Sequence, residues 1–548
     1  MLTLAHPKPR LAAALEAAVR GLGVDEVPDL ELQRSRNPAH GDYASPVAMK
    51  LARVLRRPPP EIAAEIAARV ELEEATAEAV AGYVNFRFRL DWLRVLVGAV
   101  AEEPTYGSSE GGGGLRVQVE FGSINPTGPL HIGHGRGIVL GDSLCRLLTF
   151  TGHEVQREYY VNDQNTQARR FGASVLARMR GEEPPEGGYT GDYVTELAEQ
   201  ARRDLPGVED FPDAEAEPQV RRYAIERMVE RLRTGLERID VEYDEWYRES
   251  SLWEQGLPQA AIERLRERGQ VRTGEGALWF SPEVPGWEEQ DEDRVIIRSD
   301  GEPTYFASDL GYLVSKFEVR GFQREVEVWG ADHHGYVPRM KSAMAALGYD
   351  PEDLVVILMQ LVSLKTGRMS KRQGRFVTLD DLVEQVGKDA VRYFYLLRSP
   401  DVAMEFDLDL AVSEGNENPV YYAQYAHARL CNVEPHAAQV HGSALPRDAD
   451  LSLLTAPAEL AVAQTLAYWP DVVEMAARLL EPHRLPYYVH ELADRVHAFY
   501  HTGNDDPALR VVVDDPALTR ARLELCRAAR NTLRTALGLM GVSAPERM

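Results

Sequence analysis

The sequence predicts an α/β protein, in which a parallel-sheet domain with helical insertions lies between an N-terminal α+β domain and a C-terminal all-α helix bundle. Three observations predict this fold class. The middle of the chain alternates short β-branched runs with amphipathic stretches, which is typical of a parallel sheet covered by helices. Consecutive glycines at 111–114 separate this part from the first unit. From residue 418 onward, apolar residues recur at helical spacing almost without interruption.

The first unit comprises residues 1–108. It mixes helical patterns, such as the amphipathic stretch at 11–22, with a strand-like run at 82–88. The glycine run that follows cannot hold regular structure cheaply, so we interpret it as a linker. We therefore expect a separate N-terminal domain.

The second unit, residues 115–362, carries the parallel sheet. Its strands are predicted at 115–121, 326–329 and 354–362. A helix is predicted from about 131 to 150, and a charged, helix-rich stretch at about 165–290 is interpreted as an insertion. A mixed segment at 363–412 leads to the C-terminal unit, 413–548. The helices of this unit are predicted at 420–430, 457–468, 472–480, 485–500 and 516–539.

The composition excludes several classes of protein. The 548 residues are 44% hydrophobic and 27% charged, an ordinary globular mixture. They show neither a signal peptide nor an apolar run of membrane-spanning length. The three cysteines are far apart in sequence and form neither a disulfide framework nor a zinc motif. We therefore expect a cytoplasmic protein that has no membrane partner.

The net charge of −25 at first argues against a nucleic-acid partner, because polyanions prefer basic surfaces. Binding is local, however, and the segment at 520–547 has an excess of arginine, including Arg527 and Arg530. This segment is either a solvated helix face or a local surface for RNA.

The chemistry concentrates at a predicted strand-to-helix junction. A turn ends near Pro129, and a helix begins with His131, Gly133 and His134 and continues through Gly137. Free backbone N–H groups and the positive end of the helix dipole at such a junction suit phosphate. The glycines let a ligand approach the backbone, and the two histidines share one face of the first turn. The pattern predicts a phosphate-binding site.

This motif resembles the HIGH signature of class I aminoacyl-tRNA synthetases. The resemblance implies a Rossmann-like catalytic domain. In it, His131 and His134 are catalytic, hold the ATP phosphates and stabilise the charge that develops at the α-phosphorus. It also implies that Pro129, Gly133 and Gly137 contact ATP.

A second motif follows the last predicted strand. Its residues Met369, Ser370 and Lys371 resemble the KMSKS loop of the same class, which closes over the triphosphate. The resemblance makes Lys371 the catalytic cation that stabilises the departing pyrophosphate, and it makes Met369 and Ser370 ATP contacts. Arg368 and Arg372 depart from the family pattern. The alternative interpretation is a basic surface loop.

Four segments narrow the resemblance to arginyl-tRNA synthetases, and together they span essentially the whole chain. They are the HGDY loop at 40–43, the run at 328–335, the helix start at 418–429 and the chain end at 537–548. The first of these implies that the N-terminal domain at 1–108 contacts the tRNA. The second implies that Gly330, Asp332 and His333 lie near ATP.

An arginine substrate needs fixed carboxylates, because the guanidinium group donates several N–H bonds and keeps its charge. The family resemblance places Tyr305 and Asp309 against arginine, and their spacing puts both on one helix face. It places Glu120 near the α-amino group, with Ser123 and Asn125 as further polar contacts. The alternative for each polar residue is a local turn or cap bond.

The resemblance implies an arginine–tRNA ligase that forms arginyl-adenylate from L-arginine and ATP, transfers the arginyl group to tRNA(Arg), and releases AMP and pyrophosphate. ATP is expected to arrive with Mg²⁺, without a dedicated protein metal site. A monomer is expected. The alternatives are a class I synthetase for another amino acid and a non-catalytic RNA-binding paralogue.

The C-terminal bundle is expected to bind the tRNA anticodon. Aromatic rings on which single-stranded bases can stack are offered by Tyr421, Tyr422 and Tyr425. Arg527 and Arg530 are expected to contact the same RNA. The alternative is that the three tyrosines are core residues at helical spacing.

Overall fold

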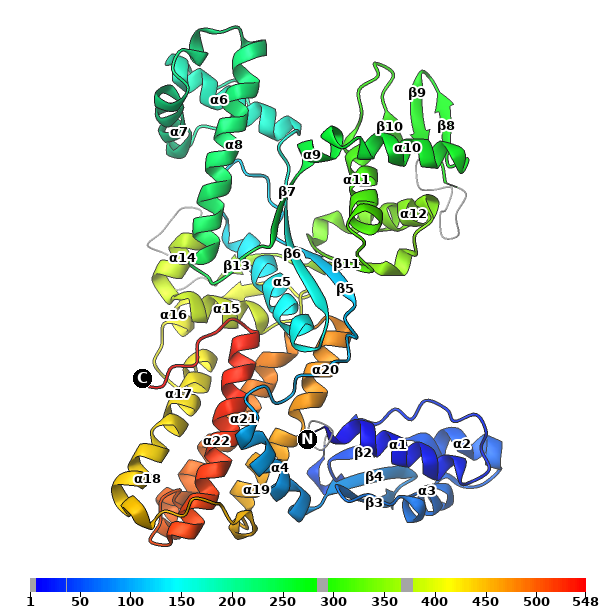
Figure 1. The fold of residues 1–548 in the computed structure, drawn as a ribbon, viewed down its shortest axis with the longest axis vertical. Helices are drawn as coiled ribbons and strands as arrows, with labels where there is room; N and C mark the ends of the chain where they lie inside the picture. The colour runs from blue at the N-terminus through cyan, green and yellow to red at the C-terminus, as the bar shows by residue number, and fades with distance from the viewer. Residues whose placement is uncertain (1–5, 36, 283–293, 366–377) are drawn as a thin grey trace.

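The computed structural model describes residues 6–35, 37–282, 294–365 and 378–548. Figure 1 shows an elongated molecule. The N-terminal domain and the C-terminal helices lie at one end, the parallel sheet lies in the middle, and two excursions from the sheet form the other end. The predicted α/β class, with a smaller mixed domain before the sheet and a helix bundle after it, is confirmed.

The central sheet contains five strands in the order β12-β11-β5-β6-β7, and every neighbouring pair is parallel. β5 (Arg116–Glu120) lies in the middle and leads through a turn to α5 (Ile132–Phe150), which returns the chain to β6 (Glu154–Val161). β11 (Arg324–Gly330) pairs with the other side of β5, and β12 (Leu354–Met359) is the edge strand next to β11. Because parallel strands end at one edge of the sheet, β5 and β11 bring their last residues to the same place.

The predicted strands at 115–121 and 326–329 are confirmed as β5 and β11. The strand predicted at 354–362 is confirmed as β12 only to Met359, because Val362 already begins β13 of a separate pair. The stretch at about 165–290 was interpreted as one insertion, but it is divided by a strand of the central sheet. Within it, β7 (Glu245–Arg248) pairs with β6 and forms an edge of the central sheet. β7 has only 4 residues and no long apolar run, so its sequence signal is weak. The chain therefore leaves the sheet twice, before and after β7.

The first excursion consists of helices. The second contains a three-stranded antiparallel sheet with helices packed on it, and it buries an apolar core of its own. The first consists of α6 (Thr166–Arg180), α7 (Asp192–Asp204) and α8 (Asp213–Glu237). The second consists of α9 (Glu249–Glu254), α10 (Leu257–Glu267), β8 (Val271–Gly274), β9 (Ala277–Phe280), β10 (Arg294–Ile297) and α11 (Tyr305–Val314), and α12 (Val337–Leu347) packs against it.

After β12 the chain forms a mixed segment, as predicted. A short parallel pair, β13 and β14, is accompanied by three helices. These elements are β13 (Val362–Leu364), α14 (Leu379–Val386), α15 (Lys388–Leu396), β14 (Met404–Phe406) and α16 (Leu408–Ala411).

The N-terminal domain is a four-stranded antiparallel sheet, in the order β1-β2-β4-β3, with helices packed on it. Its elements are α1 (Pro7–Arg20), β1 (Gln33–Arg34), β2 (Tyr43–Ser45), α2 (Val47–Leu55), α3 (Pro59–Arg69), β3 (Ala75–Val80) and β4 (Tyr83–Phe88). The loop at 40–43 docks this domain on the C-terminal helices. Asp42 accepts a hydrogen bond of 2.6 Å from the hydroxyl of Tyr468.

The helices predicted for the C-terminal unit are all present. They are α17 (Pro419–Cys431), α19 (Pro457–Ala467), α20 (Trp469–Leu479), α21 (Arg484–Asp505) and α22 (Pro516–Leu539), and α18 (Val433–His441) is added to them. α4 (Leu90–Glu102), from the first unit, packs against α22, where Asn531 donates a hydrogen bond of 3.2 Å to the carbonyl of Ala101. In the described part of the chain, no helix has the length and apolar character needed to cross a bilayer.

The glycine run at 111–114 is held in place by backbone hydrogen bonds. The N–H groups of Gly112 and Gly114 donate to the carbonyls of Thr151 and Gly152 at 2.7 and 2.9 Å. The connection between the first two units therefore lies against the end of α5.

Candidate active site

The two histidines of the predicted phosphate site lie at the start of α5. His131 is the N-cap residue, and its Nδ1 accepts a hydrogen bond from the N–H of Gly133 at 3.2 Å. Nδ1 of His134 accepts one from the N–H of His131, also at 3.2 Å. Burial lowers the pKa of both rings, and His131 further lowers that of His134. A neutral ring whose Nδ1 accepts must carry its proton on Nε2, so both side chains present N–H donors.

The turn that carries these histidines is fixed by later parts of the chain. The carbonyl of Leu130 accepts a hydrogen bond from the N–H of Leu379 at 2.8 Å, and the hydroxyl of Tyr395 donates to the carbonyl of Ile132 at 2.7 Å. Buried Arg136 donates to the carbonyl of Ser399 at 2.8 Å and to that of Val402 at 2.9 Å. These hydrogen bonds therefore anchor the start of α5 to the mixed segment.

Met369, Ser370 and Lys371, like Arg368 and Arg372, lie outside the described residues.

The glycines of the first motif differ in what surrounds them. At Gly133, a Cβ would meet only the ring of its neighbour His131, at 3.6 Å. At Gly137, a Cβ would lie 3.3 Å from Cε of Met359 and 3.6 Å from Cγ1 of Val328. Gly137 therefore allows α5 to pack closely on β11 and β12, while Gly133 stands at the more open start of the helix. Pro129 is exposed just before this start.

The carboxyl end of β11 lies beside the end of β5. Gly330 ends the strand, and a Cβ there would lie 2.4 Å from Oδ1 of Asp332, so this position is closed to larger residues unless Asp332 moves. Asp332 and His333 are exposed, and their side chains form an ion-pair contact of 3.6 Å when the imidazole is protonated. The side chains of Asp332 and His333 are therefore accessible at the sheet edge.

Tyr305 and Asp309 lie on α11, as their spacing predicted. The hydroxyl of Tyr305 accepts a hydrogen bond from the N–H of Thr166 at 3.2 Å, and its ring remains half exposed. Asp309 accepts one from the hydroxyl of Tyr336. Burial, together with the carboxylates of Glu249 and other glutamates, raises the pKa of Asp309 to about 7.

Glu249 was not predicted as a site residue. It is buried at the start of α9, where its Oε1 accepts a hydrogen bond from Ser308 at 2.8 Å. Its Oε2 is buried and accepts no hydrogen bond from the described residues. A cavity of about 430 Å³ is lined by Glu249, Tyr305 and the basic residues Arg169 and Arg298. Tyr305 therefore lines a cavity whose wall includes a carboxylate that the sequence pattern did not single out.

Asn125 and Ser123 make local contacts. Oδ1 of Asn125 accepts a hydrogen bond of 2.8 Å from Asn165, and its Nδ2 donates one of 2.9 Å to Gln167. Oγ of Ser123 accepts one of 3.0 Å from the N–H of Tyr160. These bonds tie the turn after β5 to β6 and α6.

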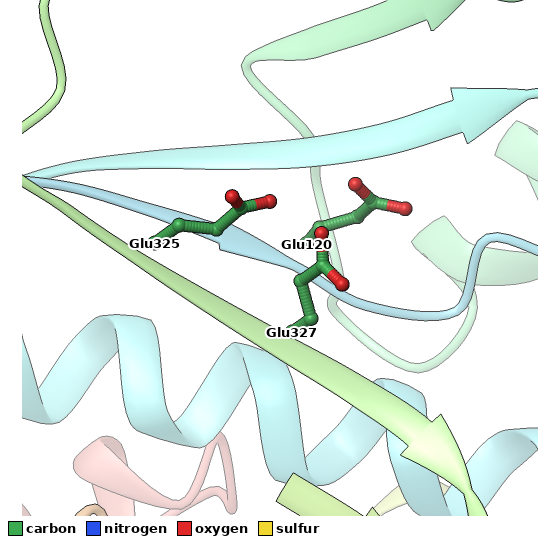
Figure 2. Close-up of side chains that lie close together, drawn as sticks. All are labelled: Glu120, Glu325 and Glu327. Atoms are coloured by element: carbon green, nitrogen blue, oxygen red, sulfur yellow. The ribbon is translucent and has the colours of Figure 1, made fainter. Parts of the chain in front are cut away.

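Glu120 ends β5 and is almost fully buried. Its Oε2 lies 2.8 Å from Nζ of Lys316, which also pairs with Glu325 and Glu327 of β11. Figure 2 shows the three glutamate side chains converging from the two neighbouring strands. They have the spacing of possible metal ligands. However, the ammonium group of Lys316 lies among their oxygens, so this cluster is not available to a metal ion.

Comparison with known proteins decides the family. Three family models match the chain in order. They are the arginyl tRNA synthetase N terminal domain at 9–88, the catalytic domain of class I (R) tRNA synthetases at 102–185 and 192–415, and the DALR anticodon binding domain at 423–548. The chain belongs to the arginyl-tRNA synthetase family.

Individual arginyl-tRNA synthetases match over the whole length. The arginine–tRNA ligase of Moorella thermoacetica is 44% identical over 99% of either chain, and that of Desulfitobacterium hafniense is 43% identical over 98% of this chain and 97% of its own. The solved structure of the Thermus thermophilus arginyl-tRNA synthetase has a TM-score of 0.79 at 26% identity, covering 98% of this chain and 100% of that one. The chain is thus an arginine–tRNA ligase, and this activity uses ATP.

The family assignment decides against both alternatives, a synthetase for another amino acid and a non-catalytic paralogue. It also gives the C-terminal helices their role, since a DALR domain binds the anticodon region of the tRNA.

The tyrosines predicted to bind tRNA in this arginyl-tRNA synthetase are partly buried on α17. The rings of Tyr421 and Tyr425 stack at 6.0 Å, and the guanidinium of Arg429 lies 4.5 Å from the ring of Tyr425. Tyr422 instead packs on His497 at 4.3 Å and donates a hydrogen bond of 2.8 Å to Asp494. Tyr422 is therefore tied to α21, while Tyr425 borders an open cavity.

The arginine-rich helix α22 uses several of its cations internally. Arg522 is buried against Glu459 at 2.6 Å. Arg527 is partly exposed and pairs with Glu434 at 3.0 Å. Arg530 is also partly exposed. The basic excess of this segment is thus smaller at the surface than the sequence implies.

Proposed function

We propose that this arginyl-tRNA synthetase activates arginine at the carboxyl edge of β5 and β11. The observation that carries the proposal is the meeting of two environments there. The Nε2 donors of His131 and His134 stand at the start of α5, and the carboxylates of Glu120 and Asp309 stand in the neighbouring acidic region. An anionic nucleotide and a cationic amino acid suit these two environments in turn.

The reaction has two steps. A carboxylate oxygen of arginine attacks the α-phosphorus of ATP, and the bond to the bridging oxygen breaks, which gives arginyl-adenylate and pyrophosphate. The terminal adenosine hydroxyl of tRNA(Arg) then attacks the arginyl carbonyl carbon, loses its proton, and displaces AMP. No general base is assigned, because positioning and charge stabilisation suffice for such transfers.

The two histidines act as donors in the first step. Their Nδ1 atoms are engaged by backbone N–H groups, so the Nε2 protons of His131 and His134 are directed to the phosphates. The N–H groups at the start of α5 add partial positive charge. These donors stabilise the charge that develops on the α-phosphoryl oxygens.

The remaining nucleotide contacts follow the family resemblance. Pro129, Gly133 and Gly137 contact ATP beside the histidines. Gly330, Asp332 and His333 contact it at the end of β11, where both side chains are accessible. Mg²⁺ arrives bound to the ATP phosphates, as this ion prefers.

The motif that resembles the KMSKS signature completes the nucleotide site. Lys371 is the catalytic cation that stabilises the departing pyrophosphate, and Met369 and Ser370 contact ATP.

Arginine lies with its guanidinium group between Tyr305 and two carboxylates, Asp309 and Glu249. Support for this placement comes from burial, since both carboxyl groups have raised pKa values and gain from a fixed cation. The α-ammonium group contacts Glu120, and Ser123 and Asn125 complete the polar surroundings.

The anticodon is bound at the end of the bundle that contains α17. A cavity of about 490 Å³ there is lined by Tyr425, Arg429, Tyr500 and the terminal Met548. An aromatic ring next to a guanidinium group suits an unstacked base. Tyr421 and Tyr422 continue the aromatic surface, and Arg527 and Arg530 contact the phosphate backbone of the RNA.

The enzyme acts as a cytoplasmic monomer. The cysteines Cys145, Cys431 and Cys526 are free thiols, which suits a reducing compartment. Light scattering during size-exclusion chromatography tests the monomer, for which the expected mass is 61.3 kDa.

Pyrophosphate exchange tests the proposed reaction. ATP and radiolabelled pyrophosphate are incubated with single amino acids, with and without tRNA(Arg). The family resemblance implies that the first step generally needs the tRNA, so we expect exchange with arginine, and only when tRNA is present. Exchange without tRNA would remove the proposed dependence of activation on tRNA. Charging of tRNA without any exchange would contradict the adenylate intermediate.

A further inference from the structure

Acidic side chains lie in one row across the central sheet. Glu327, Glu120 and Glu158 are register partners on β11, β5 and β6, so they project from neighbouring strands on one face. Glu325 precedes Glu327 by two residues and therefore shares this face. All four are buried. Neighbouring carboxylates inside a protein repel one another strongly unless cations separate them.

Two cations serve this row. Lys316 is completely buried, and its Nζ lies 2.8 Å from Glu120 and 2.9 Å from Glu327, with Glu325 also in contact. Arg320 pairs with Glu158, which also accepts a hydrogen bond from the hydroxyl of Tyr312. Four carboxylates thus face two positive charges. The row can therefore attract a further cation in addition to the described side chains.

The backbone delivers Lys316 by an unusual turn. α11 carries Tyr305 and Asp309 and continues into a π-helical turn, Ser315–Val319, which contains Lys316. Such π turns are rare in proteins, and those that occur are often found at functional sites. Burial alone would lower the pKa of Lys316, but Glu120 and Glu327 raise it above its ordinary value, so the side chain is an ammonium ion. One continuous helical segment therefore bears the predicted wall of the arginine site and the cation beneath Glu120.

Glu120 stands at the boundary of this cluster. Its Oε2 contacts Lys316, while its Oε1 accepts no hydrogen bond from any residue that the structure describes. The side chain of Glu120 keeps 11% of its surface exposed, whereas those of Lys316 and Glu325 are closed to solvent. The ammonium group thus holds Oε2 of a carboxylate whose side chain still reaches the surface of the cluster.

We propose that Lys316 is a positioning residue for arginine recognition, which fixes one oxygen of Glu120 so that the other faces the α-ammonium group of the substrate. This inference rests on the proposed role of Glu120 and extends it to a residue that never touches the substrate. Without its ammonium partner, Glu120 would be a buried, unpaired carboxylate, which either takes up a proton or turns away.

The first experiment compares two ligands that differ only at the α-carbon. L-Arginine carries the α-ammonium group, and 5-guanidinopentanoate is the same molecule without it. Arginine KM, ATP KM and the inhibition constant of 5-guanidinopentanoate are measured in tRNA charging by the full-length enzyme. For Lys316→Met we expect arginine KM to rise about 10- to 100-fold. The KM for ATP and the inhibition constant of 5-guanidinopentanoate should stay within about twofold of their normal values, because neither molecule carries an α-ammonium group that could contact Glu120.

Matched variants accompany this comparison. Lys316→Arg keeps the charge and should recover part of the lost affinity for arginine. Lys341→Met removes a partly exposed lysine of α12, which pairs with Glu352 at 2.9 Å, and it should change no constant. Equal loss of affinity for arginine and 5-guanidinopentanoate in Lys316→Met would indicate a distorted pocket and overturn the proposal. An unchanged arginine KM would overturn it too.

A double variant keeps the test decisive if Lys316→Met does not fold. Lys316→Met with Glu325→Gln removes one charge of each sign, and such paired replacements of buried ions are often tolerated. A merely structural role for Lys316 predicts normal arginine KM in the folded double variant. The positioning role predicts that KM stays high, because Glu120 still lacks its ammonium partner.

The variant Glu120→Gln separates this inference from the proposed function beneath it. Suppose that Glu120→Gln raises arginine KM without changing the inhibition constant of 5-guanidinopentanoate, and that the Lys316 variants leave arginine KM normal. In that case only the positioning role of Lys316 fails. If Glu120→Gln leaves arginine KM unchanged, the proposed contact between Glu120 and the α-ammonium group fails, and the inference fails with it.

Discussion

Asp42 in the N-terminal domain and Tyr468 at the start of α20 are joined by a hydrogen bond of 2.6 Å, from the tyrosine hydroxyl to Oδ1 of the carboxylate. Oδ2 of Asp42 accepts a second bond of 2.7 Å from the N–H of Phe88. Asp42 is buried, so one carboxylate links the sheet of the N-terminal domain to the C-terminal helices. The HGDY loop, which carries the resemblance to the family, is therefore also a joint between domains.

This joint predicts that Asp42→Ala destabilises the enzyme. The substitution leaves the N–H of Phe88 and the hydroxyl of Tyr468 buried without an acceptor, and each such group costs about 1–3 kcal/mol. We expect a lower free energy of unfolding in urea. Asp25→Ala, at an exposed position of the same domain, is the control. Equal stability of the two variants would show that the joint contributes nothing.

The histidine geometry predicts that His134→Asn separates helix capping from catalysis. An asparagine oxygen can replace Nδ1 as the acceptor for the N–H of His131, but its short side chain cannot place a donor where Nε2 stands. We expect a near-normal melting temperature and a pyrophosphate-exchange rate lower by about 10²- to 10³-fold, the usual cost of one transition-state donor. His134→Ala should lose both properties. Full activity of His134→Asn would exclude the proposed role of the imidazole.

The sequence was informative where the pattern is local. β5 and α5 follow from a β-branched run, a turn and a helical period. The helices α17, α19, α20, α21 and α22 follow from apolar spacing, whereas α18 was not predicted. Short β7 carries too little apolar pattern to compete with the charged helices around it. The spacing of Tyr305 and Asp309 was predictive because both lie on one helix.

The proposed site residues that sequence reasoning missed depend on tertiary structure. Lys316 meets Glu120 only because a π turn follows α11 and because β5 and β11 pair in one particular register. Glu249 reaches the same region from α9, across the edge of the sheet. No sequence period encodes such meetings between distant elements. A lysine within an acidic, otherwise lysine-poor region was the one available signal.

The raised pKa of Asp309 predicts that arginine binding weakens in mild acid. Burial and the nearby carboxylates of Glu249, Glu327 and Glu120 raise this pKa to about 7 in the free enzyme, although Tyr336 donates a hydrogen bond to the carboxylate. A guanidinium group binds the ionised form. Arginine affinity should therefore be constant well above pH 7 and fall as the pH drops through 7, by about tenfold per pH unit in the acid limit.

Arginine KM measured between pH 5.5 and 9 tests this prediction, with Asp309→Asn as the comparison. The variant lacks the titrating group, so its arginine KM should be higher throughout and lack the acid limb that Asp309 contributes. Because ionised Asp309 is unfavourable in the folded enzyme without substrate, the variant should also be the more stable protein at pH 8, and this advantage should shrink toward pH 4. An acid limb identical in both enzymes would assign the titration to another group.

The cavity in the C-terminal bundle predicts a division of labour at Tyr425. Its ring lies beneath the guanidinium of Arg429 at 4.5 Å, and its hydroxyl accepts a hydrogen bond from Arg429 at 2.9 Å. A base stacked on this ring would contribute about 1–3 kcal/mol. Tyr425→Ala should therefore raise the tRNA KM at least about tenfold, whereas Tyr425→Phe, which keeps the ring, should change it little.

Arginine KM at saturating tRNA should be normal in both variants, because the cavity lies in the bundle and not at the edge of the central sheet. If Tyr425→Phe weakened tRNA binding as much as Tyr425→Ala, the hydroxyl and its bond to Arg429 would account for the contribution of Tyr425 to tRNA binding. The prediction that a base stacks on the Tyr425 ring would then be wrong.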